Sequence, residues 1–239
     1  MIGNKVNINT YKKRWSILKN DHAYPNTNLV RLEKWFLKIP GRVLDHGCGY
    51  GENLIFLTTK GYNVTAVDIS EDLIEFVKIK CKLNKVPPTL FNLIAITGEE
   101  SLPFEDKSFD HIISLGVLHL MGDKKTAYKC IQELIRCLKP RGKIIVSTQG
   151  KGNSHVNDAK PLGNESYFYE ETKSNSSFDG TEKNSKDSYH KLALYIPDDD
   201  ESFASLFDGC KVDEVGSWDN DYCGIKGKHL VALATKKHE

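Results

Sequence analysis

Three glycines at alternate positions, directly behind an acid, are the residues of this chain best placed to do chemistry. In the stretch RVLDHGCGYG (residues 42–51), Asp45 is followed by Gly47, Gly49 and Gly51. An apolar pair precedes the acid, and the residues after Gly51 have helical spacing, so the pattern predicts a strand, a tight turn and a helix. Glycines let the backbone come close to a ligand and present N–H groups and a helix N-terminus to it. We therefore expect a ligand-binding turn here.

Further polar residues stand at the predicted ends of the next three strands. Asp68 comes 17 residues after Gly51, where an acid can accept hydrogen bonds from both hydroxyls of a ribose. The third strand ends at Gly98-Glu99, and the fourth ends near Leu115. Because the carboxyl ends of parallel strands meet at one edge of a sheet, these residues should share one crevice. The acid in front of the glycines disfavours a pyrophosphate and suits a zwitterionic amino-acid group and a ribose.

Strands and helices that alternate along the chain must position this crevice. The spacing predicts an α/β fold, a doubly wound and mostly parallel seven-stranded sheet with helices on both faces and right-handed crossovers. The last two strands are joined closely, so we expect an antiparallel hairpin at the C-terminus. The expected strands are 43–45, 64–67, 91–96, 109–115, 143–147, 211–218 and 229–235, and the expected helices are 29–37, 51–60, 70–86, 123–138 and 198–207.

The sequence is expected to form a single domain in four consecutive parts. After residue 148 the chain becomes rich in Asn, Ser, Gly and Lys with interleaved aromatic residues, which predicts either a disordered insert or a lid that faces the substrate. The parts are an N-terminal helical cap (1–41), a cofactor-binding core (42–149), a substrate-facing insert (150–190) and a C-terminal helix with the hairpin (191–239).

Composition narrows the class of protein. With 239 residues, a net charge of +1 and 27% charged residues, the chain has no bulk attraction to nucleic acid or to an anionic membrane. The six cysteines form no C-x-x-C pair and no zinc pattern, so we expect reduced thiols and no metal site. No signal peptide or transmembrane run is apparent. We expect a cytoplasmic protein, a monomer or homodimer, with no nucleic-acid or membrane partner.

Four motifs in chain order resemble a known family. VLDHGCGYG, AVDIS, LPFEDKSFD and SLGVLH are similar to the successive motifs of class I S-adenosylmethionine-dependent methyltransferases, in particular the bacterial branch that acts on small molecules. One glycine motif would be weak evidence, but four in order are specific. The resemblance covers residues 42–149, and it implies S-adenosyl-L-methionine as the cofactor and a Rossmann-like methyltransferase fold.

The resemblance also implies roles for individual residues. Asp45 would orient the methionine ammonium directly or through water, Asp68 would hold the ribose hydroxyls, and Ile69 would lie against the adenine. Many members carry Asp at the position of Gly98, so here Glu99, Glu100 or the backbone would read the base. Apart from the resemblance, Tyr11 and Arg14 on an expected amphipathic N-terminal helix are candidates to close over the cofactor, with Arg14 meeting its carboxylate; a solvated surface helix is the alternative interpretation. The remaining implied cofactor contacts are Gly47, Cys48, Gly49, Asn53 and Leu115.

His119 is the candidate catalytic residue. It follows the fourth strand at the cofactor edge, and its ordinary pKa near 6.5 suits a general base, although a histidine packed to shape the pocket is the simpler interpretation. His46 beside Asp45 would form a metal pair, but adjacent strand residues point to opposite faces, so we expect it packed under the neighbouring helix. Weaker candidates in the insert are His155, Tyr167, Tyr169 and Glu170.

The sequence thus predicts a methyltransferase for a small acceptor, such as a sugar or another hydroxylated metabolite. Two alternatives stay open. The chain could be a non-catalytic subunit that binds the cofactor and serves a partner, because intact cofactor motifs do not distinguish the two. A nicotinamide-dependent oxidoreductase is the second, and the glycine spacing and the antiparallel hairpin argue against it.

Overall fold

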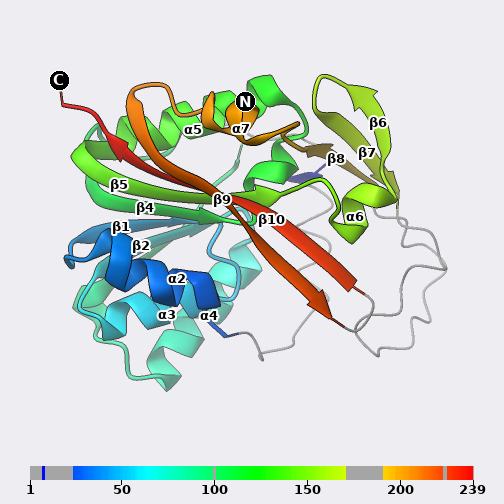
Figure 1. The fold of residues 1–239 in the computed structure, drawn as a ribbon. Helices are drawn as coiled ribbons and strands as arrows, with labels where there is room; N and C mark the ends of the chain where they lie inside the picture. The colour runs from blue at the N-terminus through cyan, green and yellow to red at the C-terminus, as the bar shows by residue number, and fades with distance from the viewer. Residues whose placement is uncertain (1–6, 9–23, 99–100, 171–190, 223–224, 239) are drawn as a thin grey trace, which may run out of the picture.

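A computed structural model describes residues 7–8, 24–98, 101–170, 191–222 and 225–238 of the chain. A seven-stranded sheet runs through its centre in the order β3-β2-β1-β4-β5-β10-β9, with helices on both faces (Figure 1). The pairs from β3 to β5 are parallel, whereas β10 pairs antiparallel with both β5 and β9. The predicted doubly wound sheet with an antiparallel C-terminal hairpin is therefore confirmed.

The predicted strands form where the sequence placed them, with shifted ends. Their bounds are β1 Arg42–His46, β2 Asn63–Asp68, β3 Phe91–Ala95, β4 Phe109–Leu115, β5 Leu138–Gln149, β9 Cys210–Tyr222 and β10 Ile225–Lys236. The terminal hairpin is longer than expected because β9 and β10 continue to pair beyond the apolar residues that signalled them. The extra length carries the hairpin past the end of β5, and a surface for ligands can form there.

The helices begin at side chains that cap their first N–H groups. Ser70 caps α4 (Glu71–Leu83), and Asp123 caps α5 (Lys124–Cys137), as their sequences indicate. The cap of α2 (Thr27–Leu32) is Asn26, whose side chain accepts from the N–H groups of Asn28 and Leu29. The sequence alone favours Thr27 or Asn28 as this cap, and that prediction is wrong because the cap lies one residue before Thr27. The other helical segments are η1 Glu33–Leu37, α3 Glu52–Thr59, η2 Pro88–Leu90, η3 Leu118–Met121, α6 Ser154–Asn157 and α7 Asp200–Ala204.

Two apolar cores fill the faces of the sheet. On one face α2, α3 and α4 pack over residues such as Val43, Ile113 and Leu233, and on the other α5 and α7 pack over residues such as Leu44 and Ile112. Alternate residues of each strand point to opposite faces, so every central strand contributes to both cores. Burial on both sides fixes the strand register and with it the positions of the strand ends.

The insert begins as ordered structure. β6 (Lys160–Gly163), β7 (Ser166–Glu170) and β8 (Lys191–Tyr195) form a three-stranded antiparallel sheet, and none of these strands was predicted from the sequence. Tyr169 lies in the apolar core of this sheet, and Glu170 pairs with Lys191, so these two candidates have structural roles. Residues 171–190 and the expected helix around Tyr11 lie outside the described residues.

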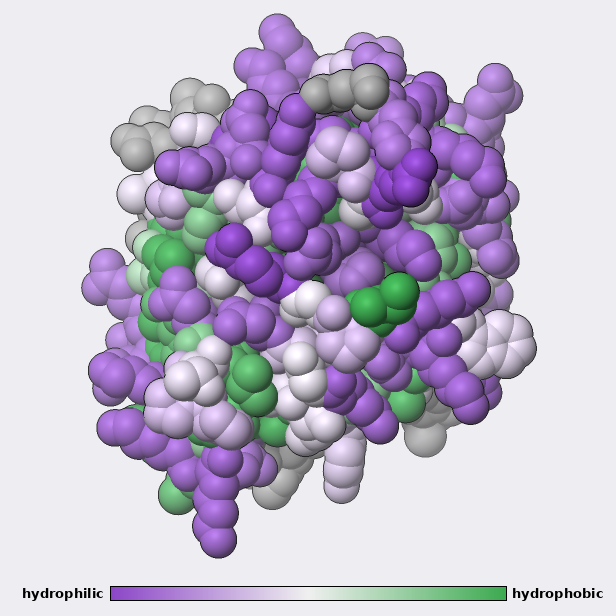
Figure 2. All heavy atoms as spheres, turned by 90° about the vertical axis from the view of Figure 1, so that its left-hand side faces the viewer, coloured by the Kyte–Doolittle hydropathy of each residue, from purple (hydrophilic) through white to green (hydrophobic). Residues whose placement is uncertain are grey.

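The acidic stretch 198–201 marks the start of a helix. Asp199 caps α7, and the described residues contain no cluster of metal-ligating side chains. The described cysteines are free and buried. No helix among the described residues has the length and apolarity needed to cross a bilayer. Figure 2 shows the side at the amino ends of the parallel strands, where hydrophilic side chains cover most of the surface.

Candidate active site

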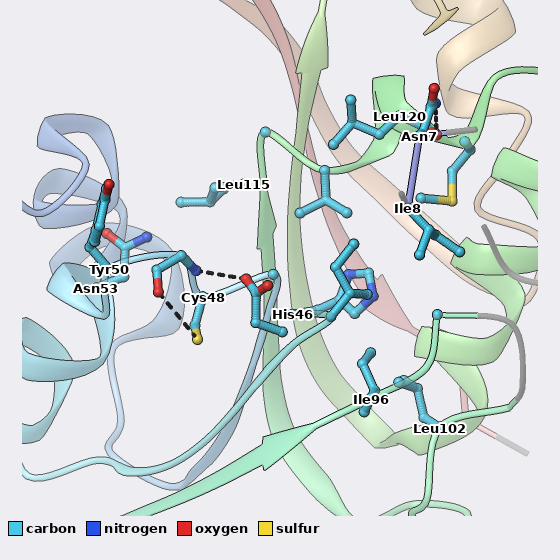
Figure 3. A pocket seen from close by; sticks show the side chains of 18 of the residues that line it. Asn7, Ile8, His46, Cys48, Tyr50, Asn53, Ile96, Leu102, Leu115 and Leu120 are labelled. Carbon is cyan, nitrogen blue, oxygen red and sulfur yellow. Dashed lines mark hydrogen bonds between the residues drawn. The ribbon is translucent and has the colours of Figure 1, made fainter. Parts of the chain in front are cut away.

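A cavity of about 300 Å³ opens where the carboxyl ends of β1, β2 and β4 meet (Figure 3). Strand ends from both sides of the sheet's crossover point leave room for a ligand there. Of the cofactor contacts predicted from the sequence, those that line this cavity are Gly47, Cys48, Gly49, Asn53, Asp68, Ile69, Gly98 and Leu115. Residues that are far apart in the chain are thus brought together as expected.

The glycine turn is held by its own hydrogen bonds. The N–H groups of Gly47 and Cys48 both donate to the carbonyl oxygen of Val67, at 2.9 and 3.0 Å, and Gly51 donates to Cys48. The N–H of Gly49 donates to Asp68. Our expectation that the turn presents bare N–H groups to a ligand was therefore wrong, because these groups bind the turn to β2. The turn contributes room instead, since a Cβ at Gly49 would meet nothing within 4 Å.

Asp45 lies beneath the turn as a buried acid with an unused oxygen. Its side chain is 1% exposed, and Oδ2 has no hydrogen-bond partner among the described residues. Burial, and then the nearby charges of Asp68 and Glu52, raise the pKa of Asp45 to about 7. A buried carboxylate without a partner is costly, so this site favours a ligand that brings a positive charge.

We expect Asp45→Asn to stabilise the protein without ligand as the pH rises. The folded-state pKa of Asp45, about 7, is above its ordinary value of 3.8. The protonated carboxyl therefore contributes to the free energy of unfolding at low pH, and the wild-type protein loses this contribution as the pH rises through 7. Asparagine carries no such charge. Urea unfolding at pH 5 and pH 8 should show a larger advantage of the variant at pH 8. The matched substitution Asp72→Asn, at an exposed position of α4, should show no such trend, and an equal advantage of Asp45→Asn at both pH values would refute the assignment.

Asp68 is fixed at the end of β2 with its carboxylate facing the cavity. Oδ2 accepts from the Gly49 N–H and Oδ1 from the Ser70 N–H, each at 3.0 Å. Burial raises the pKa of Asp68, and these backbone hydrogen bonds oppose the shift. Each carboxylate oxygen has a second lone pair, so the orientation that the two N–H groups impose leaves acceptors for two neighbouring hydroxyls.

The far end of the cavity is apolar and includes residues that the sequence did not single out. Ile96, Leu102 and Ile8 line it together with Met121. Gly98 has a φ of +75°, and a Cβ there would come within 3.0 Å of Ile69 and 3.3 Å of Ile8. In this backbone an aspartate at position 98 would be strained and crowded, so glycine suits the conformation of this turn. Glu99 and Glu100 lie outside the described residues.

The N-terminal segment reaches this cavity through Asn7 and Ile8. The Asn7 side chain donates to the carbonyl oxygens of Leu120 and Ala193 and accepts from the Ala193 N–H at 2.9 Å. It therefore joins the segment to η3 and β8 at once. The proximity of Asn7 to the crevice had no signal in the sequence, because nothing in its neighbourhood has a period. Tyr11 and Arg14 lie outside the described residues.

His119 is buried in η3 and is not among the residues that line the cavity, whereas its neighbours Val117, Leu120 and Met121 are. A catalytic role for His119 stays a prediction. His46 is not packed under the neighbouring helix as expected. It lines the cavity, and its Nδ1 lies 3.0 Å from Ser114 Oγ. Burial lowers the pKa of His46 to about 4, so the ring is neutral near pH 7. Side chains do alternate between the two faces along β1, as expected. The strand ends at His46, however, and the face on which the His46 side chain lies opens into the cavity there.

The site therefore suits an amphipathic ligand. The carboxylates of Asp68 and Glu52 and the open space at Gly49 define one end, and apolar side chains define the other. Asp45, predicted from the sequence as a cofactor contact, is buried beneath the turn and is not among the residues that line the cavity. Glu52 is paired with Lys80 Nζ at 2.6 Å, and none of the described residues that line the cavity is Lys or Arg. Such a lining attracts a cation or a neutral diol and repels a phosphate.

Comparison with known proteins identifies relatives of this chain. Residues 44–146 match the family model described as "Methyltransferase domain". The chain is 34% identical over 116 residues to "Putative methyltransferase YqeM" of Bacillus subtilis, a match that covers 46% of this chain and 44% of that protein. It is 32% identical over 132 residues to "Ubiquinone biosynthesis O-methyltransferase" of Rickettsia akari, covering 55% and 46%. The match thus spans about half the length of these curated relatives.

Other relatives differ in what their names say they act on. "Probable tRNA methyltransferase 9B" of Bos taurus is 28% identical over 109 residues, which cover 45% of this chain and 21% of that protein. Among solved structures, a Burkholderia thailandensis 1,6-didemethyltoxoflavin-N1-methyltransferase aligns with a TM-score of 0.66 at 16% identity, covering 98% of this chain and 88% of that one. At this identity the structure supports the fold alone.

Proposed function

We propose that this chain, whose residues 44–146 match a methyltransferase-domain family model, is a class I S-adenosylmethionine-dependent methyltransferase that transfers a methyl group to a small, uncharged acceptor carrying a hydroxyl group. A sugar or another hydroxylated metabolite fits this description. The observation that carries the proposal is the cavity at the ends of β1, β2 and β4, with its two acids at one end and its apolar wall at the other.

The residues of the cavity fit S-adenosylmethionine part by part. Asp68, oriented by two N–H groups, would accept the ribose hydroxyls. The unpartnered Oδ2 of Asp45 supplies the negative charge that an ammonium group needs, directly or through water. Ile69 and Ile8, on either side of Gly98, would cover the adenine. The cofactor, when bound, supplies a methyl group that is already electrophilic.

The chain's own contribution is position and exclusion of water. In-line transfer needs the acceptor atom held close to the methyl group on a fixed line. The closed apolar wall formed by Val117, Leu120 and Met121 keeps water from that end of the cavity. Of the described part of the insert, β7 pairs with β8, to which Asn7 is bound. In this proposal the N-terminal segment, held by β8, covers the apolar end of the donor cavity through Asn7 and Ile8.

A small acceptor is favoured over RNA by the charge of the site. RNA recognition relies on Lys and Arg contacts to phosphates, and the described residues that line the cavity include neither. The net charge of +1 adds no bulk attraction to a polyanion. The same lining argues against a nicotinamide dinucleotide, since its pyrophosphate would face Asp68 and Glu52.

Calorimetric titration of the purified chain tests the donor assignment. We expect S-adenosylmethionine and S-adenosylhomocysteine each to bind at a single site, and NADH to give no binding heat. Circular dichroism should verify that the sample is folded. A folded protein that binds neither sulfur compound would overturn the proposed function, and binding of NADH alone would favour an oxidoreductase.

A further inference from the structure

A second cavity, of about 280 Å³, adjoins the first. The two share Glu52, Asn53, Leu115 and Gly116 as wall residues, so a molecule in the second cavity would lie next to the polar end of the first. The other walls come from the end of β5, the start of α2 and the long C-terminal hairpin. No part of the donor assignment above uses this space.

The hairpin places two ring side chains on one face of the sheet. Trp218 of β9 is directly opposite His229 of β10, and His229 is directly opposite Gln149 of β5. Directly opposite residues project to the same side of a sheet. Ser147, two residues before Gln149, therefore shares this face, and its hydroxyl accepts from the Gly116 N–H at 3.0 Å. The indole, the imidazole and the hydroxyl thus line one cavity.

His229 presents one hydrogen-bond acceptor. Its Nδ1 lies 3.2 Å from the carbonyl oxygen of Gly227, and a carbonyl can only accept, so Nδ1 carries the hydrogen. The neutral ring then has Nε2 with a lone pair. Burial lowers the pKa of His229 despite the opposing effects of Gly227 and Asp219, so the ring is uncharged near pH 7.

The opposite wall is a fixed polar turn. The Asn26 N–H donates to Asn53 Oδ1 at 3.0 Å, and the Asn26 side chain caps α2. This holds Thr27 and Asn28 over the cavity, where they offer a hydroxyl and an amide. The single charged group in the described lining is Glu52, which Lys80 neutralises at 2.6 Å. The cavity is therefore polar, carries no charge apart from this ion pair, and is flanked by the aromatic rings of Trp218 and Tyr24.

We propose that this second cavity is the acceptor subsite, and that it binds an uncharged, hydroxyl-bearing ring against Trp218 with one hydroxyl donated to Nε2 of His229. The inference rests on the proposed methyl-transfer function and assigns the substrate side of it. An aromatic face with a few convergent polar groups is the usual composition of a site for a small polar ring. A phosphate ester would find no Lys or Arg among the described residues that line this cavity, so nothing in that lining would balance its charge.

The test uses the full chain saturated with S-adenosylhomocysteine, so that the donor cavity is filled. Ligand-observed NMR by saturation transfer is recorded with three probes at equal concentration: methyl α-D-glucopyranoside, catechol and uridine 5′-monophosphate. The first two are uncharged hydroxylated rings, one a sugar and the other an aromatic diol, and the third carries a phosphate. The variants are Trp218→Leu and His229→Leu. The matched controls are Trp35→Leu, at a residue that is 76% exposed on η1, and His238→Leu, at an exposed position near the C-terminus.

We expect at least one uncharged probe to give a saturation-transfer signal with the wild-type protein. This signal should fall fivefold or more in Trp218→Leu and in His229→Leu, and it should be unchanged in both controls. His229→Gln should retain part of it, because its amide oxygen can accept a hydrogen bond. Donor binding by calorimetry should stay unchanged in every variant. If the donor binds but neither uncharged probe does, if only the nucleotide binds, or if the variants behave like the controls, the subsite assignment is wrong while the proposed function stands. If the donor itself does not bind, both fail.

Discussion

Gly47→Ala is expected to lower the free energy of unfolding by about 2–5 kcal/mol and to abolish donor binding. Gly47 has a φ of +74° and a Cβ there would lie 2.2 Å from Cγ2 of Val117. The left-handed backbone costs an alanine about 1–2 kcal/mol, and overpacking adds about 1–3 kcal/mol. The turn would also have to move away from Val67, which holds it through the Gly47 and Cys48 N–H groups. Urea unfolding and calorimetry measure the two effects.

Gly116→Ala is the matched control for backbone strain. Gly116 has the same φ of +74°, but a Cβ there would meet nothing within 4 Å. Gly116→Ala should therefore lower the free energy of unfolding only by the cost of backbone strain, about 1–2 kcal/mol. In the double variant Gly47→Ala with Val117→Ala, the overlap is removed, so part of the loss should be recovered and the two changes should not be additive. Equal losses for Gly47→Ala and Gly116→Ala would show that contact with Val117 is unimportant.

The positions of the strands along the chain and the starts of the helices were predictable because their causes are local. Ser70 and Asp123 precede apolar periodic stretches and satisfy the first N–H groups of α4 and α5, as the sequence indicates. Asn26 was missed because three good capping residues stand in a row, and only its hydrogen bond to Asn53 shows which one is used. β8 was missed because five residues after a long polar stretch carry too short a pattern to distinguish.

The donor end of the site was predictable to the extent that it is built from strand ends. Asp68 and Leu115 follow strands whose order fixes where they meet. The positions of Ile8 and His229 were not predictable from the sequence. Ile8 reaches the crevice through tertiary contacts, and His229 reaches the adjoining cavity through the register of a long hairpin. His46 shows a further limit. Alternation gives the face of a strand, but it does not say whether that face is covered by a helix or opens into a cavity.

Asp68→Ala is expected to weaken donor binding by about 1.5–3 kcal/mol, roughly tenfold to more than a hundredfold in Kd, because charge-assisted hydrogen bonds to the ribose are lost. The structure adds a second effect. The same carboxylate accepts from the Gly49 and Ser70 N–H groups, so alanine leaves two backbone donors without their partner. Each costs about 1–3 kcal/mol where water cannot replace the acceptor. Stability without ligand should therefore fall as well.

Asp68→Asn separates these two roles. One amide oxygen remains as an acceptor, while the NH₂ group faces a backbone N–H and cannot accept from it. We expect this variant to keep part of the stability and to lose most of the donor affinity. Asp72→Ala removes a charge from an exposed position in the first turn of α4 and should change neither quantity beyond about 0.5 kcal/mol. Unaltered calorimetric affinity in Asp68→Ala would refute the ribose assignment, whereas lost affinity with unaltered stability would refute the claim that Asp68 anchors the glycine turn. The distinction matters because Asp68 would then have two roles. It would contact the ligand, and it would hold the backbone of Gly49 in the conformation that leaves room for the ligand.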